Sequence, residues 1–194
     1  MAGVGGSLSD PVAGFVLAGG RSSRMGRDKA LLELNGETLI ERALRKLKAV
    51  CEDAMIAGGS PELARFGRVI SDPTPGLGPL GGVVAALEQS SCERNLFLAV
   101  DMPFVAESVL QSLISAGGPE MVLLARADGY AQPLCGVYSR RALPVLREEL
   151  VARRLKLKEA VEATGGVAYV EFAQLDWFRN LNSPDDFRAA SGLK

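Results

Sequence analysis

The chain has 194 residues, of which 47% are hydrophobic and 23% charged, and its formal net charge is −1. These values are typical of one globular domain with a substantial core. The nearly neutral charge argues against a nucleic-acid-binding domain or a polybasic membrane surface, so we expect a protein that binds neither nucleic acid nor membrane.

Histidine is absent, which excludes Ser-His and Cys-His nucleophilic catalysis and histidine-ligated zinc. The cysteines Cys51, Cys92 and Cys135 are widely spaced, which predicts free, mostly buried thiols in a reducing cytoplasm and thus a cytoplasmic protein. Apolar runs are shorter than the ~18 residues that a transmembrane helix needs. Residues 1–11 are rich in Gly and Ser and lack a secretory signal pattern. We expect a disordered lead-in there and one domain over residues 12–194.

The stretch 12–29 combines an apolar run with a basic, glycine-containing turn. Residues 12–17 form a run of the length of a buried strand. At Gly19 and Gly20 the backbone can adopt positive φ and turn N–H groups toward a ligand. Cations follow, among them Arg24 and Lys29, and cations suit a polyanion. We interpret the stretch as a strand followed by a phosphate-binding loop, with a solvated basic turn as the alternative.

Two common phosphate-binding motifs do not fit this loop. In a Walker A loop the Lys directly follows a Gly and precedes Ser or Thr, whereas Lys29 lies three residues after Gly26 and precedes Ala30. A dinucleotide fingerprint requires G-x-G-x-x-G directly after the first strand, and residues 19–21 do not supply it.

Residues 17–31 (LAGGRSSRMGRDKAL) resemble the signature loop of nucleotidyltransferases that share an α/β nucleotide-binding fold. Within that group the loop is most similar to that of the molybdenum cofactor guanylyltransferases. The resemblance implies a Rossmann-like nucleotide-diphospho-sugar transferase fold that binds a nucleoside triphosphate. It implies that the nucleotide contacts Leu17, Ala18, Gly19 and Gly20, with Arg24 and Lys29 at its phosphates.

A second glycine-rich connection covers residues 72–82. Residues 76–81 spell G-x-G-x-x-G, but four residues separate them from the preceding strand, and Pro79 removes a backbone donor. We interpret Asp72 and the following turn as a segment that closes over the base or ribose; a rigid loop without a ligand is the alternative. The resemblance implies that such a segment, with Asp72 and Gly78, contributes to guanine nucleotide binding.

Asp101 follows residues 95–100, the clearest central strand. Ligands of open α/β sheets collect beyond the carboxyl ends of strands, and Mg²⁺ uses one or two carboxylates together with substrate phosphates. Asp101 is therefore the candidate magnesium ligand, and the alternative is a helix N-cap. The resemblance of Asp101-Met-Pro to the family's Asp-x-Pro metal site implies the metal role.

Strands and helices alternate from residue 12 onward, which predicts a three-layer, doubly wound and mainly parallel sheet with one late antiparallel strand. Thr38 and Glu41 match a capping box that starts a helix. We expect its cations to form a solvated face: Arg42, Arg45, Lys46 and Lys48. Residues 80–88, 107–116, 140–152 and 155–163 are further predicted helices, and residues 126–130 a polar loop. The basic residues 153–158 are interpreted as solvated, or as facing an anionic second substrate.

Near the carboxyl terminus, Ser183 is a predicted N-cap of the last helix, with Asp186 at the third helical position. Residues 180–186 resemble the Asn-x-Asn-x-Pro-x-Asp ending of the guanylyltransferases. That resemblance implies that Asn180 and Asn182 lie near the acceptor and the metal.

The resemblance implies an Mg²⁺-dependent transfer of GMP from GTP to molybdopterin phosphate, with catalytic roles for Arg24, Lys29 and Asp101. Other cofactor-biosynthesis or molybdoenzyme-maturation proteins are possible transient partners. Many family members have Asn after the second strand, where this chain has Ala57-Gly58-Gly59-Ser60, so base recognition would fall to backbone groups. A molybdopterin cytidylyltransferase, a sugar-phosphate nucleotidyltransferase and a non-catalytic GTP- or cofactor-binding chaperone remain alternatives.

Overall fold

The structure, a computed structural model, describes residues 11–19, 28–71 and 76–191. Within these ranges the main sheet has seven strands in the order β5-β4-β1-β6-β8-β7-β9. Its strands are β1 (Val12–Leu17), β4 (Asp53–Ala57), β5 (Val69–Ile70), β6 (Arg94–Ala99), β7 (Val122–Ala127), β8 (Tyr130–Ser139) and β9 (Val167–Phe172). Residues 1–10 of the expected lead-in lie outside the described ranges.

The sheet is mainly parallel. β1 runs parallel to both β4 and β6, β4 parallel to β5, and β7 parallel to β9. β8 is antiparallel to its neighbours β6 and β7, which confirms the prediction of an antiparallel strand late in the chain. β1 is buried along its whole length because helices cover both faces of the sheet, which is why its sequence is apolar throughout.

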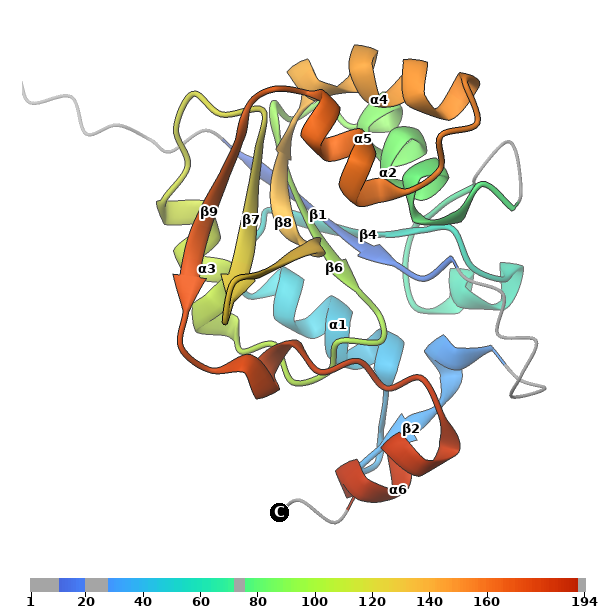
Figure 1. The fold of residues 1–194 in the computed structure, drawn as a ribbon. Helices are drawn as coiled ribbons and strands as arrows, with labels where there is room; N and C mark the ends of the chain where they lie inside the picture. Colours follow the sequence, from blue (N-terminus) through green and yellow to red (C-terminus); the bar gives the residue numbers. More distant parts are fainter. Residues whose placement is uncertain (1–10, 20–27, 72–75, 192–194) are drawn as a thin grey trace, which may run out of the picture.

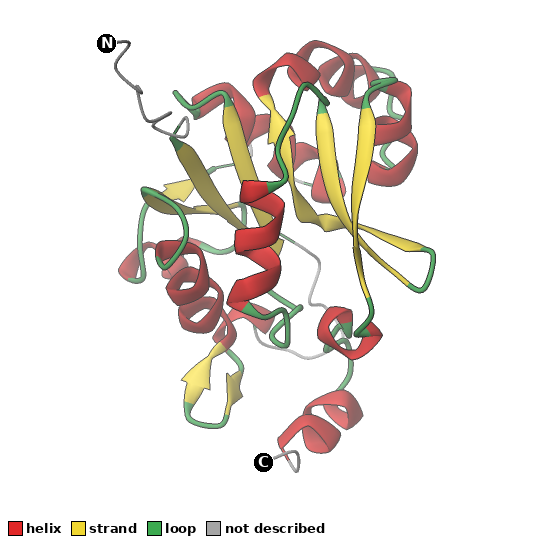
Figure 2. Ribbon diagram, turned by 90° about the vertical axis from the view of Figure 1, so that its left-hand side faces the viewer, coloured by secondary structure: helices red, strands yellow, loops and turns green. Residues whose placement is uncertain are grey.

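Helices lie on both faces of the sheet (Figures 1 and 2), and each face has its own apolar cluster. The helices are α1 (Leu39–Lys48), α2 (Gly78–Gln89), α3 (Glu107–Ser115), α4 (Leu143–Val151), α5 (Leu157–Ala163) and α6 (Pro184–Ser191). Short 3₁₀ turns are η1 (Lys29–Leu31), η2 (Pro61–Arg65), η3 (Arg140–Ala142) and η4 (Leu175–Phe178). The predicted three-layer α/β architecture is confirmed. Among the described helices, none has both the length and the apolar character needed to cross a membrane.

The strand order reverses between β1 and β6. The chain leaves β1 toward β4 on one side of the sheet, and it leaves β6 toward β7 on the other side. The two strand ends stay together, because the N–H of Val100 donates to the carbonyl of Leu17 at 3.1 Å. Such a switch point opens a crevice at the carboxyl ends of the strands, where ligands of this architecture bind.

A small hairpin precedes α1 and consists of β2 (Glu33–Leu34) and β3 (Glu37–Thr38). Asn35 and Gly36 form its turn with φ of 56° and 79°, values typical of a tight hairpin turn. Thr38 and Glu41 make the predicted capping box at the start of α1. The hairpin and α6 project from the same end of the molecule (Figure 2).

Several predicted boundaries are wrong; α5, for example, begins at Leu157 instead of residue 155. Residues 126–130 are not a polar loop, because β7 continues to Ala127 and β8 begins at Tyr130. Only Asp128 and Gly129 turn the chain, with φ of 48° and 75°, and Asp-Gly is a strong signal for a two-residue hairpin turn. α2 begins at Gly78, two residues before the predicted start, with Pro79 in its first turn.

Candidate active site

The first part of the site is the end of β1. Leu17 is its last residue, and the next residue, Ala18, is buried and donates its N–H to the carbonyl of Ala57 at 3.1 Å. This bond continues the pairing of β1 with β4 beyond the strand itself. The chain therefore reaches Gly19 in a fixed position at the carboxyl edge of the sheet.

Gly19 lies against the glycine pair that follows β4. A Cβ atom placed on Gly58 would come within 3.2 Å of the Gly19 Cα and 3.3 Å of its nitrogen. Gly58 and Gly59 also have positive φ, 76° and 89°. Glycine at position 58 thus allows two backbone segments at the strand ends to touch, which keeps side chains away from the loop predicted to bind phosphate.

Lys29 reaches the same edge of the sheet from η1. Asp28 caps this turn by accepting a hydrogen bond from the N–H of Ala30 at 3.0 Å, and the Ala30 side chain is buried. The Lys29 Nζ donates to Oδ2 of Asp101 at 2.9 Å and to Oδ1 of Asn182 at 2.7 Å. The structure therefore brings three predicted site residues together from distant parts of the sequence.

Asp101 lies at the switch point, just beyond β6. It does not cap a helix, because α3 begins only at Glu107 with Ala106 as its N-cap. The carboxylate is partly buried, with 22% of the side chain exposed, and one oxygen binds Lys29. The other oxygen, Oδ1, is buried and has no hydrogen-bond partner among the residues that the structure describes. A buried carboxylate oxygen without a partner costs free energy unless a ligand or cation meets it.

Asn182 comes from the segment before α6. The N–H of Leu181 donates to the Asp101 carbonyl at 2.9 Å, which attaches this segment to the end of β6. The Asp186 carboxylate accepts the N–H groups of Asn182 and Ser183, each at 2.8 Å, and Ser183 Oγ accepts from the Asp186 N–H at 3.2 Å. The predicted cap of the last helix is therefore confirmed, and it orders the backbone that carries Asn182.

The structure does not place every predicted site residue in this cluster. Gly20, Arg24 and Asp72 lie outside the described residues. Gly78 is the first residue of α2, with φ of 67°, and that helix packs against Leu17 at the end of β1 through Gly82. Asn180 is exposed on the segment that leads to Asn182.

The model of the MobA-like NTP transferase domain matches residues 14–166 of the chain. This chain belongs to the MobA-like NTP transferase family. A protein of Pelotomaculum thermopropionicum named "Probable molybdenum cofactor guanylyltransferase" is 35% identical over 185 residues, covering 89% of this chain and 88% of the relative. A protein of the same name from Synechococcus elongatus is 35% identical over 190 residues, covering 91% and 96%.

Solved structures of similar fold support the assignment to the MobA-like family. Molybdopterin-guanine dinucleotide biosynthesis protein A from Archaeoglobus fulgidus matches with a TM-score of 0.78 and 27% identity, over 92% of this chain and 96% of that protein. The 2-C-methyl-D-erythritol 4-phosphate cytidylyltransferase from Thermus thermophilus matches with a TM-score of 0.66 over 92% and 96%, but at 19% identity this likeness concerns the fold alone.

A member of the MobA-like family is a nucleotidyltransferase, and the donor set here fits a hard divalent cation. Among the described residues, no group of three or more Asp, Glu or Cys side chains forms a ready metal cage. Mg²⁺ does not need one, because substrate phosphates and water complete its coordination. The unpartnered Asp101 Oδ1 is an oxygen of the kind that Mg²⁺ prefers.

The cysteines are free, as predicted, but only Cys135 is fully buried, and Cys51 and Cys92 are half-buried. Burial raises the pKa of the Cys51 thiol to about 12, and it raises the pKa of Cys135, on β8, to about 12. A thiol with such a pKa stays protonated at neutral pH and is a poor nucleophile. Neither the Cys51 nor the Cys135 thiol is therefore suited to act as a nucleophile in this MobA-like enzyme.

The predicted solvated face of α1 is wrong in part. Lys48 and Arg45 are exposed, but Arg42 is half-buried and Lys46 is buried, with 8% exposure. The missed signal is spacing: Lys46 lies seven residues after Leu39 and three after Ala43, which places it on the apolar stripe of α1. The residue type alone predicts that Lys46 is exposed to solvent, because lysine is rarely buried.

Proposed function

We propose that this protein transfers GMP from GTP to the phosphate of molybdopterin, in its Mo-molybdopterin form, to give molybdopterin guanine dinucleotide and pyrophosphate. The observation that carries the proposal is the contact of Lys29 with both Asp101 and Asn182 at the strand ends. Names of curated relatives at 35% identity support guanine and the molybdenum cofactor as the substrate classes.

The triphosphate is the ligand of Lys29 in this proposal. The Lys29 ammonium, the backbone of Ala18 and Gly19, and the residues Gly20 and Arg24 would neutralise its negative charge. Leu17 would contact the nucleotide at the end of β1, and Asp72 and Gly78 would lie beside the base or ribose. The Lys29–Asp101 ion pair supports this role, because it holds the ammonium at the crevice before a phosphate arrives.

Asp101 would hold a magnesium ion through Oδ1, the oxygen that has no partner in the described structure. The chemistry that such an ion supplies is neutralisation of charge on the phosphate oxygens. The Asn182 amide oxygen accepts a hydrogen bond from Lys29, which in turn binds Asp101. This contact supports a position of Asn182 and Asn180 on the side of the site where the acceptor would bind.

Bond making and breaking need little from the protein beyond position and charge. An oxygen of the acceptor phosphate attacks the α-phosphorus in line, and the bond from that phosphorus to the oxygen bridging to the β-phosphate breaks. Pyrophosphate leaves with the electron pair. Because a phosphate monoester is already ionised near pH 7, no general base is required, which agrees with a sequence that contains no histidine.

The reaction is tested by nucleotide preference. Purified protein with Mg²⁺ and a molybdopterin-type acceptor is given GTP, CTP, ATP or UTP in turn, and pyrophosphate release is measured. We expect release with GTP, and its loss when the acceptor is omitted or EDTA is added.

Each other outcome selects one of the alternatives. Pyrophosphate release with CTP would support the same mechanism with cytosine, in place of guanine, as the recognised base. Release from GTP with a sugar phosphate as acceptor would identify a sugar-phosphate nucleotidyltransferase. Tight GTP binding without release for any acceptor would favour a GTP- or cofactor-binding chaperone and overturn the proposal. Fractionation of the native cells tests the proposed cytoplasmic location, and co-purification from them tests contact with other cofactor-biosynthesis or molybdoenzyme-maturation proteins.

A further inference from the structure

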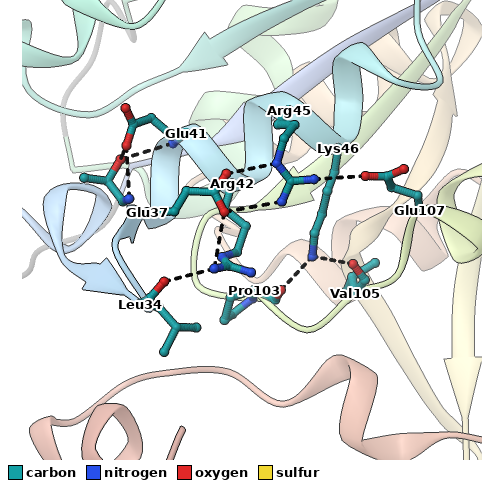
Figure 3. A network of polar contacts seen from close by, with 10 residues as sticks. Leu34, Glu37, Glu41, Arg42, Arg45, Lys46, Pro103, Val105 and Glu107 are labelled. Atoms are coloured by element: carbon teal, nitrogen blue, oxygen red, sulfur yellow. Dashed lines mark hydrogen bonds and ion pairs between the residues drawn. The ribbon is translucent and has the colours of Figure 1, made fainter. Parts of the chain in front are cut away.

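A buried lysine connects α1 with the loop that follows β6. The Lys46 Nζ donates hydrogen bonds to the carbonyl oxygens of Pro103 and Val105, each at 2.6 Å, as Figure 3 shows. Both bonds cross from the helix to a segment that lies more than fifty residues later in the chain. The buried side chain of Lys46 therefore fixes this loop to α1.

Burying this cation is costly. Desolvation, together with the charges of Arg42 and Arg45, lowers the pKa of the Lys46 ammonium to about 8. Glu107 and Glu37 act in the opposite direction but do not compensate. A methionine or leucine at this position would pack without that cost. The two hydrogen bonds are therefore the interaction that offsets the desolvation of the lysine.

The loop that Lys46 holds is the one that begins with Asp101. Its own backbone bonds are long: Met102 N–H to the Ala99 carbonyl at 3.2 Å, and Val105 N–H to the Met102 carbonyl at 3.4 Å. The two bonds from Lys46 are shorter, and a charged donor makes a stronger hydrogen bond than a neutral one. The course of the loop beyond Asp101 thus depends on Lys46 more than on its internal turns.

The same helix also holds the other half of the site. The Leu39 N–H donates to the carbonyl of Leu32, directly after η1, at 2.9 Å, and Arg42 donates to the carbonyl of Leu34 at 2.9 Å. α1 is therefore a rigid bridge between the segment that carries Lys29 and the loop that carries Asp101.

We propose that Lys46 is a positioning residue, which acts through the Pro103 and Val105 carbonyls to set the Asp101 carboxylate relative to Lys29 and to the metal and triphosphate. This inference rests on the proposed function. Lys46 does not touch the substrate; its effect reaches the reaction through the placement of Asp101. Some residues orient a metal ligand without touching the metal. Their removal typically lowers activity or metal affinity by about 10–100-fold.

The test compares Lys46→Met with a matched control on the same helix, Lys48→Met, whose side chain is exposed. Met keeps the unbranched apolar stem of Lys46, is one heavy atom shorter, and removes both hydrogen bonds. We expect Lys46→Met to lower kcat by about 10–100-fold and to raise the Mg²⁺ concentration for half-maximal rate, with little change in KM for GTP. Lys46→Arg, which keeps the charge and the donors, should recover part of the rate.

A second measurement does not depend on turnover. Hydrogen–deuterium exchange should speed up in residues 101–106 of Lys46→Met while the amides of β1 and β6 keep their protection. Binding of Mn²⁺, followed by electron paramagnetic resonance in the presence of GTP, should weaken in parallel. Should the wild-type protein catalyse no transfer, the proposed function fails, while exchange and Mn²⁺ binding still test Lys46.

Two results would overturn the inference. One is a Lys46→Met protein with unchanged kcat, Mg²⁺ dependence and loop exchange. The other is uniform loss of protection across the whole sheet with wild-type kcat per folded molecule, because that pattern would make Lys46 a general stability residue. If Lys46→Met does not fold, Lys46→Arg must show slower transfer and faster exchange in residues 101–106, or the inference is wrong.

Discussion

The Lys29 ammonium lies 2.9 Å from the Asp101 carboxylate, although the two residues are 72 positions apart in the sequence. Asp101 lies just beyond the end of β6, at the point where the strand order reverses between β1 and β6. Its side chains are partly buried, with 16% and 22% exposure, so their charges interact through a medium less polar than bulk water. The two charges neutralise each other in this structure, and in the proposed function a triphosphate and its metal would take the place of these partners.

Lys29→Ala should damage catalysis far more than stability. The ion pair is still in contact with solvent, so its loss should lower the free energy of unfolding by about 1 kcal/mol or less. Removing a cation aimed at the triphosphate should lower kcat/KM by about 100–1000-fold. Steady-state kinetics with GTP and urea unfolding measure the two effects, with Lys48→Ala as the control. A Lys29→Ala enzyme of wild-type activity would contradict the assigned role of the loop.

Asp101→Asn should abolish the response to Mg²⁺. The substitution keeps the size of the side chain and removes the charge that a hard cation requires. We expect a loss of more than about 100-fold in kcat that excess Mg²⁺ does not restore. Asp128→Asn is the matched control, since Asn is equally suited to the positive φ of that turn. If both variants have the same Mg²⁺ dependence, Asp101 is not the metal ligand.

Local patterns in the sequence were sufficient for much of the fold. The apolar run 12–17, the Asn35-Gly36 turn and the Thr38–Glu41 capping box each depend on neighbouring residues, and the structure has all of them. The hairpin at Asp128-Gly129 was equally local, but the charged side chains around it were interpreted as a loop.

Such local patterns do not predict contacts between distant segments of the chain. The family resemblance pointed to Lys29, Asp101 and Asn182, but their mutual contact depends on η1, the end of β6 and the cap of α6 meeting at one edge. The burial of Lys46 follows from its place on the apolar stripe of α1, but its partners could not be predicted, because they are main-chain carbonyls more than fifty residues away and carbonyls carry no sequence signal.

The stability of the wild-type protein should rise relative to Lys46→Met as the pH increases from 8 to 10.5. The pKa of Lys46 is about 8 in the folded protein, because of desolvation, against 10.5 as the ordinary value. Between these values the unfolded chain binds more protons than the folded one, so the free energy of unfolding increases with pH. Below pH 8 and above 10.5, both states carry the same charge and the difference is constant.

Urea unfolding of both proteins at pH 7.5 and 9.5 measures this effect, and we expect a relative gain on the order of 1–2 kcal/mol. The difference between the two proteins is needed because other groups titrate in this range. The thiols of Cys51 and Cys135 have a pKa raised to about 12, so they lower the free energy of unfolding as the pH rises above the ordinary pKa of a thiol. This effect is present in both proteins. A parallel pH dependence of wild type and Lys46→Met would show that Lys46 titrates normally.

Gly58→Ala should weaken nucleotide binding in addition to destabilising the fold. Its φ of 76° costs any L-residue about 1–2 kcal/mol, and a Cβ atom would press on Gly19 at 3.2 Å. Gly36→Ala is the matched control, because Gly36 has a similar φ of 79° and no atom within 4 Å of the added Cβ. Both variants should lose comparable stability from backbone strain, but only Gly58→Ala should displace Gly19 and raise KM for GTP, by about tenfold. Equal KM values in the two variants would mean that the Gly19–Gly58 contact serves folding alone.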